Sequence, residues 1–92
     1  MKSRYAVRAL TELARLERSQ AGRLVRLSEV AERRGVPLQF LEQVFAALRR
    51  GGVVRSRRGA SGGYTLARPA DETTVLDVVV ALDGDVQHGG LV

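Results

Sequence analysis

Three residues, Gly35, Val36 and Pro37, separate two segments of helical pattern near the middle of this 92-residue chain. Glycine suits a left-handed cap at the end of the first helix, and proline suits the start of the second helix. Two helices joined by a turn of this kind are the signature of a helix-turn-helix. The length allows one domain, and 45% of the residues are apolar, so the chain can bury a modest core.

The helix after this turn is predicted over about 37–50, because apolar residues recur there on one face at helical spacing. Gln39 and Gln43 fall in line on the opposite face with Glu42 beside them, so these side chains are expected to point away from the core. The helix before the turn is short. Ser28 is predicted as its N-cap, since serine there can bond the free N–H groups of the first turn.

A helix before this pair is predicted over about 3–18, where apolar residues again recur at helical spacing. Arg8 and Glu12 fall on its outer side in i, i+4 register, which favours an ion pair between them. A basic cluster at the start of this helix, which includes Arg4, could reach a DNA backbone.

Positive charge is concentrated from Gln43 to Pro69, a stretch with six arginines and no carboxylate. Two short strands are expected within it, around the turn sequence RRGASGG, where Gly62 and Gly63 can take the backbone angles that a hairpin needs. The predicted fold class is therefore mainly α with a small β-hairpin, a winged helix-turn-helix. Positive charge without a local partner points to a phosphate-rich partner, and double-stranded DNA fits that description.

A last helix is predicted from Thr74, which with Asp77 comes close to a capping box. Gly84 is expected to stop this helix. The residues after it are too few and too rich in glycine to predict another element. The expected division of the chain is a winged helix-turn-helix DNA-binding domain over 1–84 and a short flexible C-terminal tail over 85–92.

The second helix of a winged helix-turn-helix normally enters the major groove of DNA. Glutamine can bond to adenine and glutamate to the cytosine amino group, whereas arginine suits phosphates and narrow minor grooves. The base-reading candidates are Gln39, Phe40, Glu42 and Gln43. The candidates for minor-groove or phosphate contact are Arg57, Arg58, Ser61, Arg49, Arg50 and Arg4. The alternatives are a solvated helix face, a mobile hairpin tip that serves solubility, and core packing for Phe40.

The composition excludes several classes of site. The chain has no cysteine, which removes a thiolate nucleophile and a cysteine-ligated zinc or iron–sulfur site. His88 is the only histidine, so neither a histidine-based triad nor a multi-histidine metal site can form within one chain. No window approaches a bilayer-spanning run. We therefore expect no enzyme activity, no cofactor, no membrane insertion and a cytoplasmic location.

Three blocks of the chain resemble the IscR/NsrR-type winged-helix transcription regulators of bacteria: SRYAVRALTELARL, LSEVAERRGVPLQFLEQVFAALRRGGVVRSRRGASGGYTLARP and TTVLDVVVALDGDV. The resemblance runs over nearly the whole sequence and implies that LQFLEQVFAALR is the recognition helix. It also implies that Gln39, Phe40, Glu42 and Gln43 approach bases and that Arg58 enters the minor groove. Unlike such relatives, the sequence lacks cysteine and stops where they continue into a sensor loop and a long dimerisation helix.

The sequence therefore predicts a sequence-specific, double-stranded DNA-binding transcriptional regulator. Its recognition helix over about 37–50 would lie in the major groove, and its wing over 55–68 on the minor groove and phosphates. The resemblance further implies a repressor and a homodimer on two-fold operators, with the usual dimerisation helix absent from this chain. The alternative is a winged-helix protein-interaction module, in which the patch from Arg49 to Arg68 docks an acidic partner.

Overall fold

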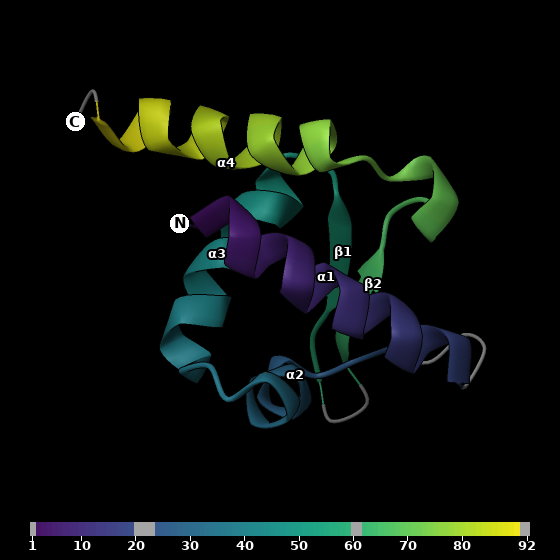
Figure 1. The fold of residues 1–92 in the computed structure, drawn as a ribbon. Coiled ribbons are helices and arrows are strands. Elements are labelled where there is room, and N and C mark those ends of the chain that lie inside the picture. Colours follow the sequence, from purple (N-terminus) through teal and green to yellow (C-terminus); the bar gives the residue numbers. More distant parts are fainter. Residues whose placement is uncertain (1, 20–23, 60–61, 91–92) are drawn as a thin grey trace.

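The computed structural model describes residues 2–19, 24–59 and 62–90. It is mainly helical with one antiparallel hairpin, as the sequence predicts. Figure 1 shows α4 lying over α1 and α3 along one edge of the molecule, with α2 at the opposite edge. The elements in chain order are α1 (Lys2–Ser19), α2 (Leu27–Arg34), α3 (Leu38–Arg50), β1 (Val54–Arg57), β2 (Gly63–Leu66), the 3₁₀ helix η1 (Ala70–Glu72) and α4 (Val75–Gly90).

The turn between α2 and α3 has the predicted form. Gly35 takes left-handed angles, φ 62° and ψ 37°, at the end of α2. The Val36 N–H then donates to the Ala31 carbonyl at 3.1 Å, which satisfies one of the free carbonyls of that helix end. Pro37 stands at the N-cap of α3 with φ −59°, the angle that its ring imposes. The helix-turn-helix prediction is confirmed.

The start of α2 differs from the prediction. This helix begins at Leu27, and Arg26 occupies the N-cap position without a side-chain capping bond. Ser28 therefore lies inside the first turn and is not the N-cap. The physical reason is the burial of Leu27, which is 8% exposed and belongs to the core, so packing draws the helix start two residues earlier than capping by Ser28 would.

The core lies where α1, α3 and α4 meet, and the base of the hairpin closes it. Phe45 on α3 has no exposed surface, and its ring packs edge-on against Tyr64 of β2 with ring centroids 5.2 Å apart. Each fully buried side chain of this size contributes about 1.5–3 kcal/mol relative to an exposed one. The largest fully buried side chains are Phe45, Leu13, Leu41, Leu48, Val25, Val30 and Val54.

The hairpin is fixed at its base by a third extended segment. Val25 and Tyr64 exchange two backbone hydrogen bonds of 2.9 and 2.7 Å, so the chain before α2 pairs with β2. Gly63 lies opposite this segment with φ 155°, and a Cβ there would stand 2.7 Å from the Val25 carbonyl oxygen. At Gly62 a Cβ would overlap the Arg57 carbonyl. Close backbone approach therefore explains both predicted hairpin glycines.

The start of α4 confirms the predicted capping box. The Thr74 N–H donates to Asp77 Oδ2 at 2.9 Å, and the Asp77 N–H donates to Thr74 Oγ1 at 3.1 Å. The predicted stop at Gly84 is wrong, because α4 continues to Gly90. Glycine in a helix interior costs about 1 kcal/mol relative to alanine, a cost that α4 can bear, and Gly84 does not take the left-handed angles of the common glycine cap. The expected tail over 85–92 thus begins inside α4.

Candidate nucleic-acid interface

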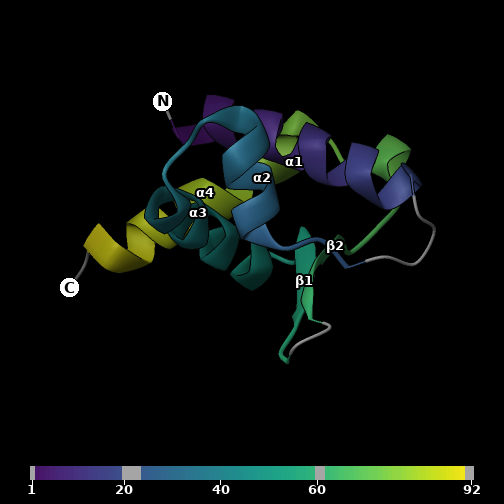
Figure 2. The ribbon, with the colours of Figure 1, turned by 90° about the horizontal axis from the view of Figure 1, so that it is seen from below.

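The hairpin projects away from the helical body beside α3, as Figure 2 shows. The three residues Gly51, Gly52 and Val53 connect the end of α3 to β1, and the two elements are in contact. Gly52 has φ 78°, a left-handed angle that turns the chain sharply at this point. The predicted base readers lie on α3, and the predicted wing arginines lie on the hairpin.

Three of the four base-reading candidates point outward from α3. The side chains of Gln39, Glu42 and Gln43 are exposed, as their spacing predicts. Phe40 is different, because it is half-buried and its ring meets Tyr5 of α1 edge-on, with centroids 5.6 Å apart and planes at 83°. This contact favours packing over base reading for Phe40 and ties the start of α3 to α1.

The arginine candidates are exposed. Among the residues that the structure describes, Arg49, Arg57 and Arg58 form no ion pair with a carboxylate. Arg50 at the end of α3 and Arg4 near the start of α1 are also exposed. Arg49 at the end of α3 and Arg57 and Arg58 on the hairpin thus carry positive charge that no described carboxylate pairs with. Ser61, the remaining candidate, lies outside the described residues.

One arginine of the basic stretch does have a partner. Arg68 Nη2 lies 3.6 Å from Asp77 Oδ2 at the start of α4. The pKa of Asp77 is lowered, first by the hydrogen bonds from the Thr74 N–H and hydroxyl, and then by the charge of Arg68. Arg68 is therefore paired within the domain. The sequence gives no sign of this ion pair, because it depends on how α4 folds back towards the end of the hairpin.

Sequence reasoning placed Glu12 on the outer side of its helix beside Arg8, and the structure corrects this. Glu12 is 5% exposed. Its Oε2 lies 2.5 Å from Arg15 Nη2, and its Oε1 lies 3.5 Å from Arg34 Nε at the end of α2. The hydrogen bond from Arg15 lowers the pKa of Glu12, and the charge of Arg34 adds to this, against the opposing effect of burial. The ion pair between Glu12 and Arg34 joins two helices, so it cannot be predicted from residue spacing within α1.

A second carboxylate, which the sequence did not single out, holds the wing. Glu17 near the end of α1 accepts a hydrogen bond from the Thr65 hydroxyl and one of 3.4 Å from the Leu66 N–H. Both donors belong to β2. This link therefore ties the base of the hairpin to α1.

The described residues show no helix long and apolar enough to cross a membrane. They also contain no group of three or more His, Cys, Asp or Glu side chains placed to hold a metal ion.

Comparison with known proteins agrees with this geometry. A family model described as "Rrf2: Iron-dependent Transcriptional regulator" matches residues 1–90. The HTH-type transcriptional regulator IscR of Cereibacter sphaeroides is 45% identical over 85 residues, which cover 92% of this chain and 54% of that protein. IscR of Photorhabdus laumondii is also 45% identical, with 92% of this chain and 50% of that protein covered. The chain spans about half the length of the curated relatives it matches.

Solved structures show the same fold. T. potens IscR superposes with a TM-score of 0.79 at 40% identity, covering 89% of this chain and 58% of that one. CymR, the global cysteine regulator of B. subtilis, superposes with a TM-score of 0.79 at 33% identity, covering 91% and 63%. These likenesses confirm the predicted winged-helix class and the resemblance to IscR-type regulators. The relatives are transcriptional regulators rather than enzymes, as the sequence predicts.

The family description includes the word iron, which raises the question of whether this chain has the donor atoms to hold an iron–sulfur cluster. Iron–sulfur clusters are held by cysteine thiolates, with histidine as an occasional replacement. These 92 residues include no cysteine and one histidine. The residues present therefore do not fit an iron–sulfur cluster.

Proposed function

The chain belongs to the Rrf2 family of transcriptional regulators, and on this premise we propose that it binds double-stranded DNA sequence-specifically and acts as a repressor. One observation carries the proposal. Exposed amide and carboxylate groups on α3 accompany three exposed arginines, Arg49, Arg57 and Arg58, that form no ion pair with a described carboxylate. In this proposal α3 enters the major groove, and the wing over 55–68 lies on the minor groove and the phosphates.

The outward face of α3 supplies the base contacts. An α-helix with its side chains is about 10–12 Å across, and the major groove is about 12 Å wide, so the helix fits. Gln39 and Gln43 can each bond bidentately to adenine, and Glu42 can accept from the cytosine amino group. A good contact of this kind discriminates against the wrong base by about 1–3 kcal/mol. Phe40 packs behind this face and sets its position through Tyr5.

The arginines supply affinity that does not depend on sequence. Arg57 and Arg58 lie on the wing, where one can enter a narrow minor groove while the other meets phosphate. Arg49 and Arg50 end α3 and suit the phosphates that flank the major groove. Arg4 reaches the backbone from α1. Each phosphate contact releases a condensed cation, so binding weakens steeply with salt.

A repressor in this proposal acts by covering its promoter. One winged helix makes few contacts, and a two-fold operator needs two copies placed about one helical turn apart, so the functional species is a homodimer. The competing function is a protein-interaction module whose basic patch docks an acidic protein. The same arginines would serve it, but the uncharged glutamines of α3 would have no role.

The decisive experiment selects preferred duplexes from a random DNA library and then measures affinity for the selected and a scrambled duplex across a salt series. We expect a steep decline in log affinity with log salt on both duplexes, and tighter binding to the selected one. Arg58→Gln should weaken both and flatten the slope by about 0.9. Glu42→Ala should remove much of the preference and leave the slope unchanged. Weak binding that neither depends on salt concentration nor favours the selected duplex would instead support the protein-interaction module.

The control for Arg58→Gln is Arg18→Gln, which removes the same charge from α1 outside the proposed interface. It should leave both the slope and the preference near those of the unchanged chain. Sedimentation with and without the selected duplex tests the homodimer, because two chains per duplex are expected. Transcription from a promoter that carries the selected site should fall when the protein is added, and a rise would contradict the repressor role.

A further inference from the structure

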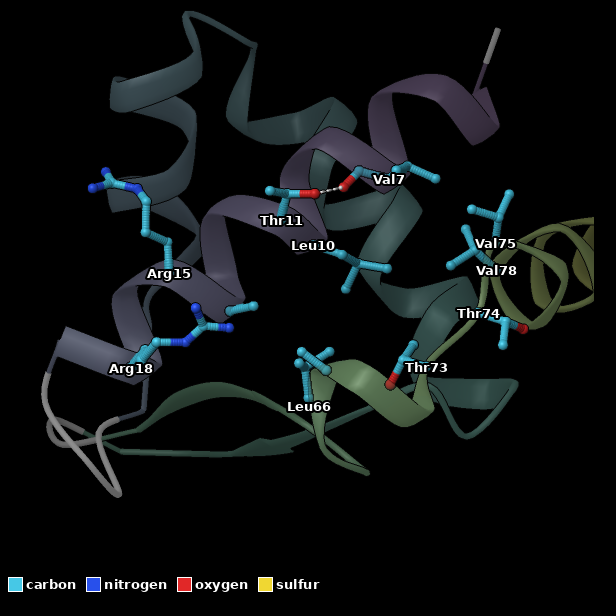
Figure 3. A pocket seen from close by; sticks show the side chains of 12 residues that line it. Val7, Leu10, Thr11, Arg15, Arg18, Leu66, Thr73, Thr74, Val75 and Val78 are labelled. Carbon is cyan, nitrogen blue, oxygen red and sulfur yellow. Dashed lines mark hydrogen bonds between the residues drawn. The ribbon is translucent and has the colours of Figure 1, made fainter.

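A cavity of about 400 Å³ opens between α1, the end of β2 and the start of α4 (Figure 3). None of the residues proposed to contact DNA lines it. Its walls are mainly apolar, with Val7 and Leu10 from α1, Leu66 from β2 and Val78 from α4. A volume of this size falls within the range of about 300–1,000 Å³ that small-molecule sites occupy.

The hydroxyl groups of the cavity are already bonded within the protein. Thr11 donates to the Val7 carbonyl at 2.8 Å, and Thr73 donates to the Pro69 carbonyl at 3.1 Å. The Thr74 hydroxyl oxygen accepts from the Asp77 N–H in the first turn of α4, and its O–H is engaged by the Asp77 carboxylate. Hydrogen-bond donors for a ligand must therefore come from the arginines of α1.

The two arginines beside the cavity differ. Arg15 is bound to Glu12 at 2.5 Å, and Figure 3 shows its guanidinium turned away from the cavity. Arg18 lies at the edge of the cavity with its guanidinium directed along it, and it forms no ion pair with a described carboxylate. No carboxylate lines the cavity. One guanidinium without an ion pair to a described carboxylate thus faces an apolar hollow.

We propose that this cavity binds a small organic monocarboxylate with an apolar body. The forked guanidinium of Arg18 matches a carboxylate, and the apolar body packs on Leu10, Leu66 and Val78. Arg18 also lines a neighbouring groove, which contains Glu17 and Asp71. Their negative charge disfavours a second carboxylate on the ligand, so the site selects a monoacid over a diacid.

The position of the site gives such a ligand contact with the base of the wing. Leu66 ends β2, and its N–H donates to Glu17, one residue before Arg18 on α1. The inference does not depend on the proposed DNA-binding function, because its test measures ligand binding alone.

The test is an NMR titration of the whole chain with octanoate at constant ionic strength, followed on the methyl groups. We expect saturating shifts at Val7, Leu10, Leu66 and Val78. Arg18→Gln should weaken octanoate binding about tenfold, whereas Arg15→Gln should leave it within about twofold. Octan-1-ol, which has the apolar body without the charge, should bind more weakly than octanoate and should not respond to Arg18→Gln. Acetate, which has the charge without the body, should not produce these shifts.

Several results would overturn the proposal. One is the absence of saturation with octanoate, and another is octanoate binding that Arg18→Gln leaves unchanged. Shifts that gather on α3 and the hairpin would also overturn it, since they indicate non-specific anion binding on the basic side. A second variant, Ala14→Leu, fills the cavity without removing a core side chain, because Ala14 lines it and is half-buried. This variant should remain folded by circular dichroism and lose octanoate binding.

Discussion

Glu12 of α1 and Arg34 of α2 are joined across the domain, with Oε1 of the carboxylate 3.5 Å from Nε of the guanidinium. Glu12 is 5% exposed, whereas the side chain of Arg34 is 37% exposed. The second carboxylate oxygen is held by Arg15 at 2.5 Å. One buried carboxylate therefore links the first helix to the helix-turn-helix, while both arginines keep contact with water. This arrangement limits the desolvation cost that a fully buried ion pair would carry.

Glu12→Gln should lower the free energy of unfolding by about 1–2 kcal/mol. The amide keeps the shape of the side chain but loses the negative charge that pairs with Arg15 and Arg34, and both arginines can still be solvated. Urea unfolding at pH 7 measures the change. The control is Arg8→Gln, a nearby exposed residue of α1, which should change stability by less than about 0.5 kcal/mol. Equal free energies of unfolding for Glu12→Gln and the unchanged chain would show that the ion pairs of Glu12 make no net contribution to stability.

Stability should fall in acid, and two carboxylates contribute to this. The pKa of Glu12 is held below its ordinary value of 4.5, and that of Asp77 below 3.8. The unfolded chain takes up protons first as pH falls. The stabilisation is therefore complete above the ordinary values and is lost progressively as pH drops through the lowered ones. Urea midpoints from pH 7 to pH 3 should show this decline, and the difference between the unchanged chain and Glu12→Gln should shrink with it.

The features that the sequence predicts correctly have local causes. The left-handed turn at Gly35 and the capping box of Thr74 and Asp77 each depend on residues within one helical turn. The outward direction of Gln39 and Gln43 follows from helical period alone. These signals are readable because they need no knowledge of which elements pack together.

The errors arise where distant contacts decide. Leu27 shifts the start of α2 because it is drawn into the core, which a capping rule cannot foresee. Gly84 is tolerated inside α4, although glycine often ends helices. Glu12 and Glu17 each bond to an element far along the chain, so helical spacing shows them only as polar positions. The exposure of Gln39, Glu42 and Gln43 was predictable from the helical period, but the link between α1 and the wing was not.

Two glycines should respond differently to alanine. In Gly35→Ala the added Cβ would have no atom within 4 Å, and the cost comes only from the left-handed backbone angle. We expect the free energy of unfolding to fall by about 1 kcal/mol. Gly63→Ala would bring a Cβ to 2.7 Å from the Val25 carbonyl oxygen and disturb the pairing with Tyr64. We expect a loss of about 2–4 kcal/mol there. Thermal or urea unfolding of both variants gives the comparison, and equal losses would contradict the close-approach explanation.

Glu17 should act as a positioning residue for the wing. Its carboxylate accepts hydrogen bonds from the Thr65 hydroxyl and the Leu66 N–H, and Glu17 is not among the residues proposed to contact DNA. Glu17→Ala should therefore speed hydrogen exchange at the Leu66 amide, because that N–H loses its acceptor. Glu32→Ala, at an exposed site on α2, is the matched control and should leave this exchange rate unchanged.

If the proposed DNA binding holds, Glu17→Ala should also weaken affinity for the selected duplex several-fold. The arginines of a loosened wing would have to be ordered on binding, and this ordering costs about 0.5–1.5 kcal/mol for each immobilised side chain. The salt slope should stay the same, since no phosphate contact is removed. Faster exchange with unchanged affinity would mean that the wing direction does not limit binding. Unchanged exchange would mean that Glu17 does not hold the wing at all.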